Sequence, residues 1–256
     1  MLDRIFYSLT NRTKEIDVKT LPSLGIFYPP DFRIVIKKCD MEDILSYEKD
    51  FVPNDITQII NLIKRLLSRS IMLPKKYTFD YVKSIDLIYL FLELVTWTNS
   101  KKINFNLYHS ITGNIVHVVE FGKDSFNYFD TKPFIDNFDF ETREFVIDEW
   151  RFSVPSVGVE TSIMEYLHFK RSQGTSLELL NNLDYNFMYF LGNRNVVSVE
   201  EIDNIVTIFN EDLDEDSKKK VTQIVEMFKD LSKYTVSWQG AVYEISNKID
   251  LASIWK

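Results

Sequence analysis

The chain has 256 residues, of which 45% are hydrophobic, including 20 Phe and 13 Tyr, and this composition excludes global disorder and allows a substantial core. Its net charge of -8, with acidic and basic residues interspersed, leaves no basic surface for duplex nucleic acid or an anionic membrane. The single cysteine, Cys39, excludes an internal disulfide and fits a reducing compartment. Because the chain also has no secretory signal and no apolar run near the roughly 20 residues of a membrane span, we expect a soluble, intracellular protein.

The first predicted elements are one strand and two helices. Residues 33–38 alternate between apolar and polar side chains and predict a strand. Asp40 is a suitable N-cap for a short helix that continues to about residue 48. From Asn54, isoleucine and leucine recur at intervals of three, four and seven, which predicts a longer helix that ends near Pro74.

The next part of the chain combines a central helix with antiparallel strands. Ser84 or Asp86 begins a helix that is apolar on nearly all sides, so we expect it to be central. After residue 102 the period changes to two, and the segments 103–107 and 115–121 predict a hairpin around Gly113. A third strand at 125–129 would complete a small meander.

The second half of the chain predicts several helices and a final hairpin. Helices are expected at 160–170 and at 177–191, where paired asparagines weaken the pattern. Ser198 and Glu201 form the Ser-x-x-Glu pattern of a capping box, which predicts another helix start. A last helix is expected at 214–231, followed by a hairpin over 235–245 that turns at Gln239-Gly240.

This order of elements predicts an α+β fold that is predominantly helical and carries two small antiparallel hairpin or meander elements. A hairpin follows helices in each half of the chain. We therefore predict two lobes, residues 1–132 and residues 133–256. Whether the two lobes are related to each other stays open.

One five-residue sequence motif, which we call the Pro-Ser phrase, occurs twice, 133 residues apart. Its two copies are Leu21-Pro-Ser-Leu-Gly25 and Val154-Pro-Ser-Val-Gly158. In each copy proline fixes one backbone angle and glycine can supply a positive one, as turns require. We interpret the two copies as turns through which the chain enters two similar lobes.

No pattern in the sequence predicts a metal site. His109 and His117 lie symmetrically about Gly113, but no further ligands occur at zinc spacing. The acidic run Asp212 to Asp216 resembles the start of a calcium loop, yet its sixth and twelfth positions, Ser217 and Gln223, are not the glycine and glutamate that such a loop needs. We expect these acids to cap a helix.

Catalytic patterns are also missing from the sequence. Neither Ser23 nor Ser156 stands in a nucleophile elbow, and there is no phosphate-binding or dinucleotide-binding glycine pattern, so no cofactor is expected. The alternative from another class is a metal-dependent hydrolase that uses Glu93, His109, His117 or His168.

Many aromatic side chains could fill the core or anchor partners; they are Phe27, Tyr28, Tyr128, Phe129, Phe138, Phe140, Phe145, Trp150, Phe152 and Trp255.

The opening phrase through Tyr28-Pro29, the strand Ile34-Val-Ile36 and the acidic segment Met41 to Leu45 resemble the opening of the baseplate hub proteins of T-even-like contractile-tailed bacteriophages. The second phrase through Glu160 and the closing hairpin, which ends in residues 249–255, are similar to later parts of the same family. Some relatives, as the resemblance suggests, carry cysteine pairs in the hairpins. The segments 104–121 and 236–245 have none, so metal binding is not expected here, and whether the hairpins are degenerate zinc ribbons stays open.

The resemblance implies a non-enzymatic factor, either an assembly chaperone or a hub component, that binds other baseplate hub or tail proteins during assembly in the host cytoplasm. A permanent subunit of the virion baseplate is the alternative within the same family, and the oligomeric state stays open. We expect the first phrase to contribute to the partner-binding surface through Leu21, Pro22, Gly25, Phe27 and Tyr28.

Overall fold

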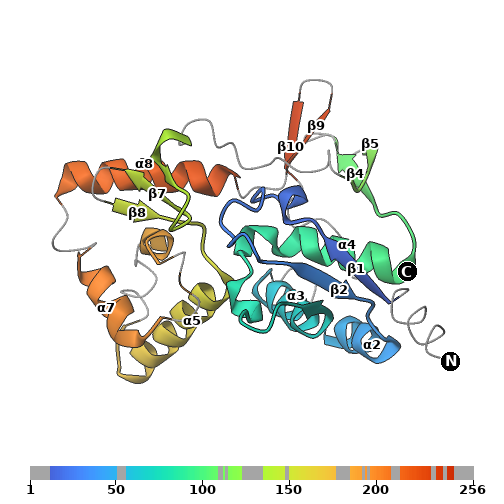
Figure 1. Ribbon diagram of the computed structural model, residues 1–256, viewed down its shortest axis with the longest axis horizontal. Helices are drawn as coiled ribbons and strands as arrows, with labels where there is room; N and C mark the ends of the chain where they lie inside the picture. Colours follow the sequence, from blue (N-terminus) through green and yellow to red (C-terminus); the bar gives the residue numbers. More distant parts are fainter. Residues whose placement is uncertain are drawn as a thin grey trace.

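The computed structural model has an α+β fold in which helices predominate (Figure 1). It describes residues 12–50, 56–108, 112, 115–122, 135–147, 150–176, 185–191, 194, 197–208, 214–231, 235–238 and 241–244. The predicted fold class is therefore confirmed. No helix within these ranges is both long enough and apolar enough to cross a membrane.

A small antiparallel sheet begins the described part of the chain. Strand β1 (Thr13–Ile16) pairs with β2 (Ile34–Lys37), which pairs in turn with β3 (Ile71–Met72). The sequence predicted β2 only. The two flanking strands have four and two residues, too few for an alternation to be recognised, and they extend because β2 offers them a partner.

Three helices pack with this sheet, and all three were predicted. Helix α2 (Met41–Asp50) is capped by Asp40, whose carboxylate accepts a hydrogen bond from the backbone N–H of Asp43 at 3.0 Å. Helix α3 (Ile56–Ser70) ends before the predicted Pro74 because the chain enters β3. A 3-10 turn, η3 (Ser84–Asp86), leads directly into α4 (Leu87–Asn99), of which seven residues are buried.

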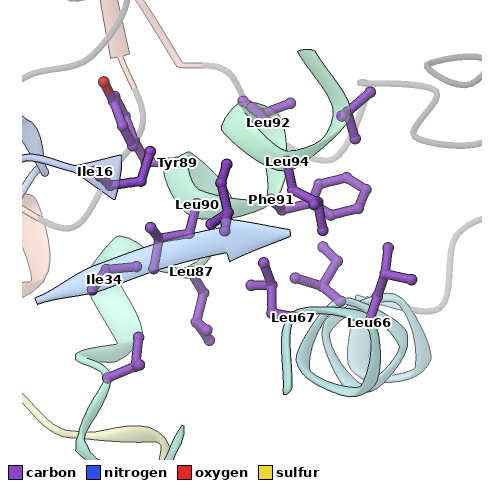
Figure 2. Close-up of a cluster of buried hydrophobic side chains, with 14 of the residues drawn as sticks. Ile16, Ile34, Leu66, Leu67, Leu87, Tyr89, Leu90, Phe91, Leu92 and Leu94 are labelled. Carbon is purple, nitrogen blue, oxygen red and sulfur yellow. The ribbon is translucent and has the colours of Figure 1, made fainter. Parts of the chain in front are cut away.

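The first hydrophobic cluster lies between these helices and the sheet. In Figure 2, Leu66 and Leu67 of α3 point toward Phe91 of α4, while Ile34 of β2 lies beside Leu87. Helix α4 is apolar on nearly all sides because it is covered from several directions, as its sequence predicted.

A second antiparallel sheet was not predicted. Its strands are β6 (Phe138–Asp139), β7 (Glu144–Ile147) and β8 (Trp150–Phe152), in that order. Phe145 is paired with Phe138 on one side and with Phe152 on the other, and all three side chains are buried. The strands are too short to show a clear alternation, so the sheet depends on these aromatic cross-strand contacts. The third meander strand predicted at 125–129 lies outside the described residues.

Helices α5 (Val157–Ser172), α7 (Val199–Thr207) and α8 (Glu215–Leu231) cover the second sheet's side of the molecule. The predicted capping box is present: Ser198 accepts from the backbone N–H of Glu201, and the Glu201 carboxylate accepts from that of Ser198. Helix α5 begins three residues before the predicted start because Ser156 caps it. Of the helix predicted at 177–191, residues 177–184 lie outside the described ranges and Tyr185–Tyr189 form a 3-10 helix, η6.

Both predicted hairpins are confirmed. Strand β4 (Asn104–Tyr108) pairs with β5 (Ile115–Glu120), and β9 (Thr235–Trp238) pairs with β10 (Ala241–Glu244). Each pair is antiparallel and forms a sheet of two strands. The turn residues Gln239 and Gly240 lie outside the described residues, as does Gly113.

The buried side chains form two hydrophobic clusters, and Figure 1 shows the corresponding elements on opposite sides of the molecule. The first cluster draws on residues up to Ile103 and the second on residues from Phe138 onward, with three exceptions. Phe27 and Ile85 belong to the second cluster, and Val157 belongs to the first. The predicted boundary at 132/133 lies outside the described residues, so the division into lobes stays a prediction of domain organisation.

Candidate functional site

The two Pro-Ser turns, far apart in the sequence, meet at one short segment, residues 82–86. In the first turn, the backbone N–H of Ser23 donates to Asp86 Oδ1 at 2.9 Å. In the second, the carbonyl of Pro155 accepts from the N–H of Ser84 at 2.9 Å, and the N–H of Val157 donates to the carbonyl of Val82 at 2.8 Å. We call this meeting point the turn junction, and it consists of Ser23, Tyr28, Lys83, Asp86 and Ser156.

The first turn has a tight and unusual backbone. Leu24 and Gly25 both lie in the left-handed region, at φ 54° and 70°. A β-carbon at Gly25 would be 2.9 Å from the carbonyl oxygen of Val18, so both the backbone angle and the available space require glycine there. This geometry turns the N–H of Ser23 toward the interior, where Asp86 accepts it.

A chain of hydrogen bonds runs through the buried side of the junction. Tyr28 donates its hydroxyl proton to Asp86 Oδ2 at 2.8 Å, and its oxygen accepts from the backbone N–H of Lys83 at 2.9 Å. The exposed fractions of Tyr28, Lys83 and Asp86 are 2%, 4% and 0%. Three titratable side chains are thus removed from water at the place where the two clusters meet.

Burial shifts the pKa values of these groups toward their neutral forms. Loss of hydration raises the pKa of Asp86 to about 6, against the opposing effects of its bonds from Ser23 and Tyr28 and the charge of Lys83. The same loss lowers the pKa of Lys83 to about 7, although Asp86 and Glu144 favour its charged form. Burial, followed by the charge of Asp86, raises the pKa of the Tyr28 hydroxyl.

The second turn has a different local structure from the first. Ser156 is the N-cap of α5, and its hydroxyl accepts from the N–H of Val159 at 3.2 Å while donating to the carbonyl of Arg194 at 2.9 Å. Gly158, which corresponds to Gly25, is inside the helix and has no positive φ. The interpretation of the two phrases as equivalent turns is therefore wrong at the level of the backbone.

The residues predicted to bind a partner are mostly interior. Leu21, Pro22, Phe27 and Tyr28 are buried, and Gly25 is half-buried. Their partner-binding role stays a prediction, but their side chains cannot serve as exposed anchors in this conformation. Core filling explains most of the described aromatics, because Phe138, Phe145 and Phe152 are also buried while Phe140 is 61% exposed. Tyr128, Phe129 and Trp255 lie outside the described residues.

Two cavities adjoin the first turn and share Tyr28, Pro29, Pro30 and Arg143. The larger, of about 810 Å³, extends along β1 and the following turn and includes Gly25 in its lining. The smaller, of about 410 Å³, lies against Lys83 and the β6–β7 turn, which contains Phe140 and Arg143. The turn junction therefore has an accessible side, formed by both halves of the chain.

Of the candidate metal and hydrolase residues, the structure describes the side chains of Glu93 and His168. Glu93 pairs with Lys14 at 2.5 Å, His168 is exposed on α5, and neither lines the two cavities. His109 lies outside the described residues, as does the side chain of His117. Within the described ranges no three His, Cys, Asp or Glu side chains are grouped as metal ligands.

The acidic run before α8 has the expected capping role where it is described. Asp214 accepts from the N–H of Ser217 at 2.7 Å through its carboxylate, which lowers its pKa. Asp212 lies outside the described residues.

Sequence reasoning missed Lys83, Asp86 and Arg143. No spacing or motif marks them, since Asp86 reads as a helix cap and the other two as surface cations. Compared with protein-family models, curated proteins and solved structures, the chain matches none of them. Chemically, the site is a buried group of hydrogen-bonded side chains next to a cavity that is lined by the basic residues Lys83 and Arg143.

Proposed function

We propose that this chain is a non-enzymatic protein that binds other hub or tail subunits while the baseplate of a contractile phage tail is assembled. The proposal depends on the ordered resemblance of its opening segment, second Pro-Ser phrase and closing segment to baseplate hub proteins. Its action would take place in the host cytoplasm. The alternative within phage biology is a permanent subunit of the virion baseplate.

The observation that supports this proposal most is the convergence of both resembling phrases on residues 82–86. The two phrases contribute backbone bonds and buried side chains to one joint, and neither phrase presents a nucleophile to the cavities. Ser23 donates its N–H to a structural carboxylate, and the Ser156 hydroxyl caps a helix. Both serines therefore take part in structural hydrogen bonds.

Exposed apolar side chains provide surfaces for such contacts. On α2, Met41 and Leu45 lie one helical turn apart, with exposed fractions of 68% and 56%. Large apolar side chains in this exposure range are typical of protein contact sites when they are grouped. Arg33 is exposed and lines the larger cavity together with Gly25 of the first turn, so a substitution there tests whether a partner contacts this turn.

Co-expression with the proteins encoded beside this chain in its source genome, followed by affinity purification, tests the proposal. We expect a stable complex with at least one hub or tail protein. Complexes with none of them would contradict it. Two variants locate the contact: Arg33→Glu at the first-turn cavity, and Met41→Glu with Leu45→Glu on α2. Lys101→Glu, in an exposed position after α4, is the matched control.

Purified mature particles distinguish the two phage roles. A transient assembly factor is absent from them, whereas a permanent subunit remains at a fixed ratio to the other baseplate proteins. Either result leaves the binding proposal intact, because both roles require contact with hub subunits.

A further inference from the structure

The smaller cavity at the turn junction has the size of a ligand site and a lining of aromatic, proline and charged residues. Its volume of about 410 Å³ lies in the range that small-molecule sites occupy. Six of its ten lining residues are aromatic or proline, namely Phe27, Tyr28, Tyr81, Phe140, Pro29 and Pro30, and the other four, Lys83, Glu141, Thr142 and Arg143, are polar or charged. The aromatic and proline part of the wall favours a ligand with an apolar body.

Arg143 brings a positive charge to this cavity and to its larger neighbour. It is half-buried, and in the described part of the chain its guanidinium has no hydrogen-bond acceptor or ion-pair partner. Its backbone is fixed, since φ is 62° and its N–H donates to the carbonyl of Asp139 at 2.8 Å. The Asp139 carboxylate fastens the same turn by accepting from the N–H groups of Glu141 and Thr142.

The other charges around the cavity limit the charge of the ligand. Lys83 and Arg143 are its basic residues and Glu141 is its acid, which leaves one positive charge in excess when Lys83 is protonated and none when Lys83 is neutral. Asp86 and Glu144 lie outside the lining but act on Lys83 and oppose a second negative charge nearby. The lining therefore matches a single negative charge better than a polyanion.

We propose that this cavity binds a carboxylate carried on an apolar or aromatic body, with the Arg143 guanidinium as its counter-ion. A guanidinium fork matches the two oxygens of a carboxylate. Both a small organic acid and the free C-terminus of an apolar peptide offer this chemistry. The proposal does not depend on the chain's role in tail assembly.

Isothermal titration calorimetry on the full chain tests the binding. The probes are 3-phenylpropionate, its uncharged amide and inorganic phosphate, together with N-acetyl-diphenylalanine as the free acid and as the amide. We expect the acids to bind and the amides and phosphate to bind at least about tenfold more weakly, as the loss of one charge-assisted hydrogen bond requires. The tighter of the two acids identifies the source of the carboxylate. Equal binding of acids and amides, or no binding of either acid, would overturn the proposal.

Three variants test the role of Arg143. Arg143→Met should weaken acid binding about tenfold or more, and Arg143→Lys should restore part of it. Arg143→Gly removes the same charge while suiting the positive φ, so a failure to fold cannot account for its loss of binding. Arg171→Met is the matched control, because Arg171 is an exposed arginine in the last turn of α5 and lines neither cavity. Unchanged affinity in Arg143→Gly would contradict the assignment.

Discussion

The two Pro-Ser turns share a pattern of residues and a target, but they have different backbones. The first is an irregular turn with two consecutive left-handed residues, and it bonds to the carboxylate of Asp86 through a main-chain N–H. The second is the start of a helix, and it bonds to residues 82–84 through main-chain groups on either side of Ser156. The difference comes from the chain after each phrase, because Ile26 to Arg33 lead to a strand, whereas Val157 onward forms α5.

The two turns therefore make different kinds of hydrogen bond to residues 82–86, where the two hydrophobic clusters meet. The first turn contributes a buried, charge-assisted contact, and the second contributes neutral backbone contacts. Charged partners in an interior cost far more when one of them is removed than neutral ones do. We expect this inequality to appear in four measurements, of which the first has the largest effect.

Removal of the carboxylate should be the most damaging change at the junction. In Asp86→Ala the N–H of Ser23 and the hydroxyl of Tyr28 lose their acceptor. Lys83 also loses a negative charge that favours its protonated form. We expect a loss of about 3–5 kcal/mol in the free energy of unfolding, measured by chemical denaturation. Asp17→Ala, at an exposed 3-10 cap, is the control and should cost about 1 kcal/mol or less. Similar losses in both variants would disprove the special role of Asp86.

Gly25 should be intolerant of a side chain. Gly25→Ala combines an unfavourable positive φ with a contact of 2.9 Å to a backbone oxygen, and we expect it to cost about 3 kcal/mol. Gly174→Ala also has a positive φ, but no atom lies within 4 Å of its new β-carbon, so only about 1 kcal/mol should be lost. The difference between these two free energies of unfolding measures the close approach alone. Equal losses would show that the first turn shifts enough to relieve the close contact between the new β-carbon and the carbonyl oxygen of Val18.

The stability of the protein should depend on pH through the junction. The pKa of Asp86 is raised in the fold, so its stabilising contribution is present below pH 3.8 and is lost as pH rises through about 6. The pKa of Lys83 is lowered, so its contribution is present above pH 10.5 and is lost as pH falls through about 7. The junction should therefore stabilise the protein least between about pH 6 and 7.

This pH dependence is measured as the free energy of unfolding against pH, for the natural chain and for the double variant Asp86→Asn with Lys83→Met. The difference between the two should change by about 3 kcal/mol along the acidic limb and by somewhat more along the basic limb. A difference that stays constant from about pH 4 to about pH 10 would show that neither group titrates in the fold as stated.

The smallest loss of stability should come from removal of the two serine hydroxyls. Here the substitution in the second turn should cost more than the one in the first turn, the reverse of the order expected for the charged contact. Ser156→Ala removes a helix cap and a bond to the carbonyl of Arg194, so it should cost about 1–2 kcal/mol. Ser23→Ala keeps the N–H that bonds Asp86 and loses the bond that the hydroxyl accepts from Gly25, so about 1 kcal/mol or less is expected. Thermal unfolding of the two variants side by side gives this order. A larger loss in Ser23→Ala would mean that its hydroxyl, which also lowers the pKa of Asp86, is the principal support of the carboxylate.

Helix starts were predicted well because their causes are local. Asp40, Ser198 and Asp214 each cap the helix that follows within three residues, so the sequence contains both partners of the bond. The two hairpins were found for the same reason, since each strand's partner is only a turn away. The β6–β7–β8 sheet was missed because its strands are very short, and its aromatic side chains read equally well as core or surface.

The sequence by itself therefore determined the α+β class, the positions of most helices and both hairpins, all of which depend on neighbours within a few residues. Only the tertiary structure decided that the repeated phrase takes two conformations and that both copies meet at residues 82–86. It also decided that Lys83 and Asp86 are buried and that Lys83 lines a cavity together with Arg143. Contacts such as Ser23 with Asp86 join residues 63 positions apart, and the loss of hydration that shifts the pKa of a side chain depends on everything packed around it.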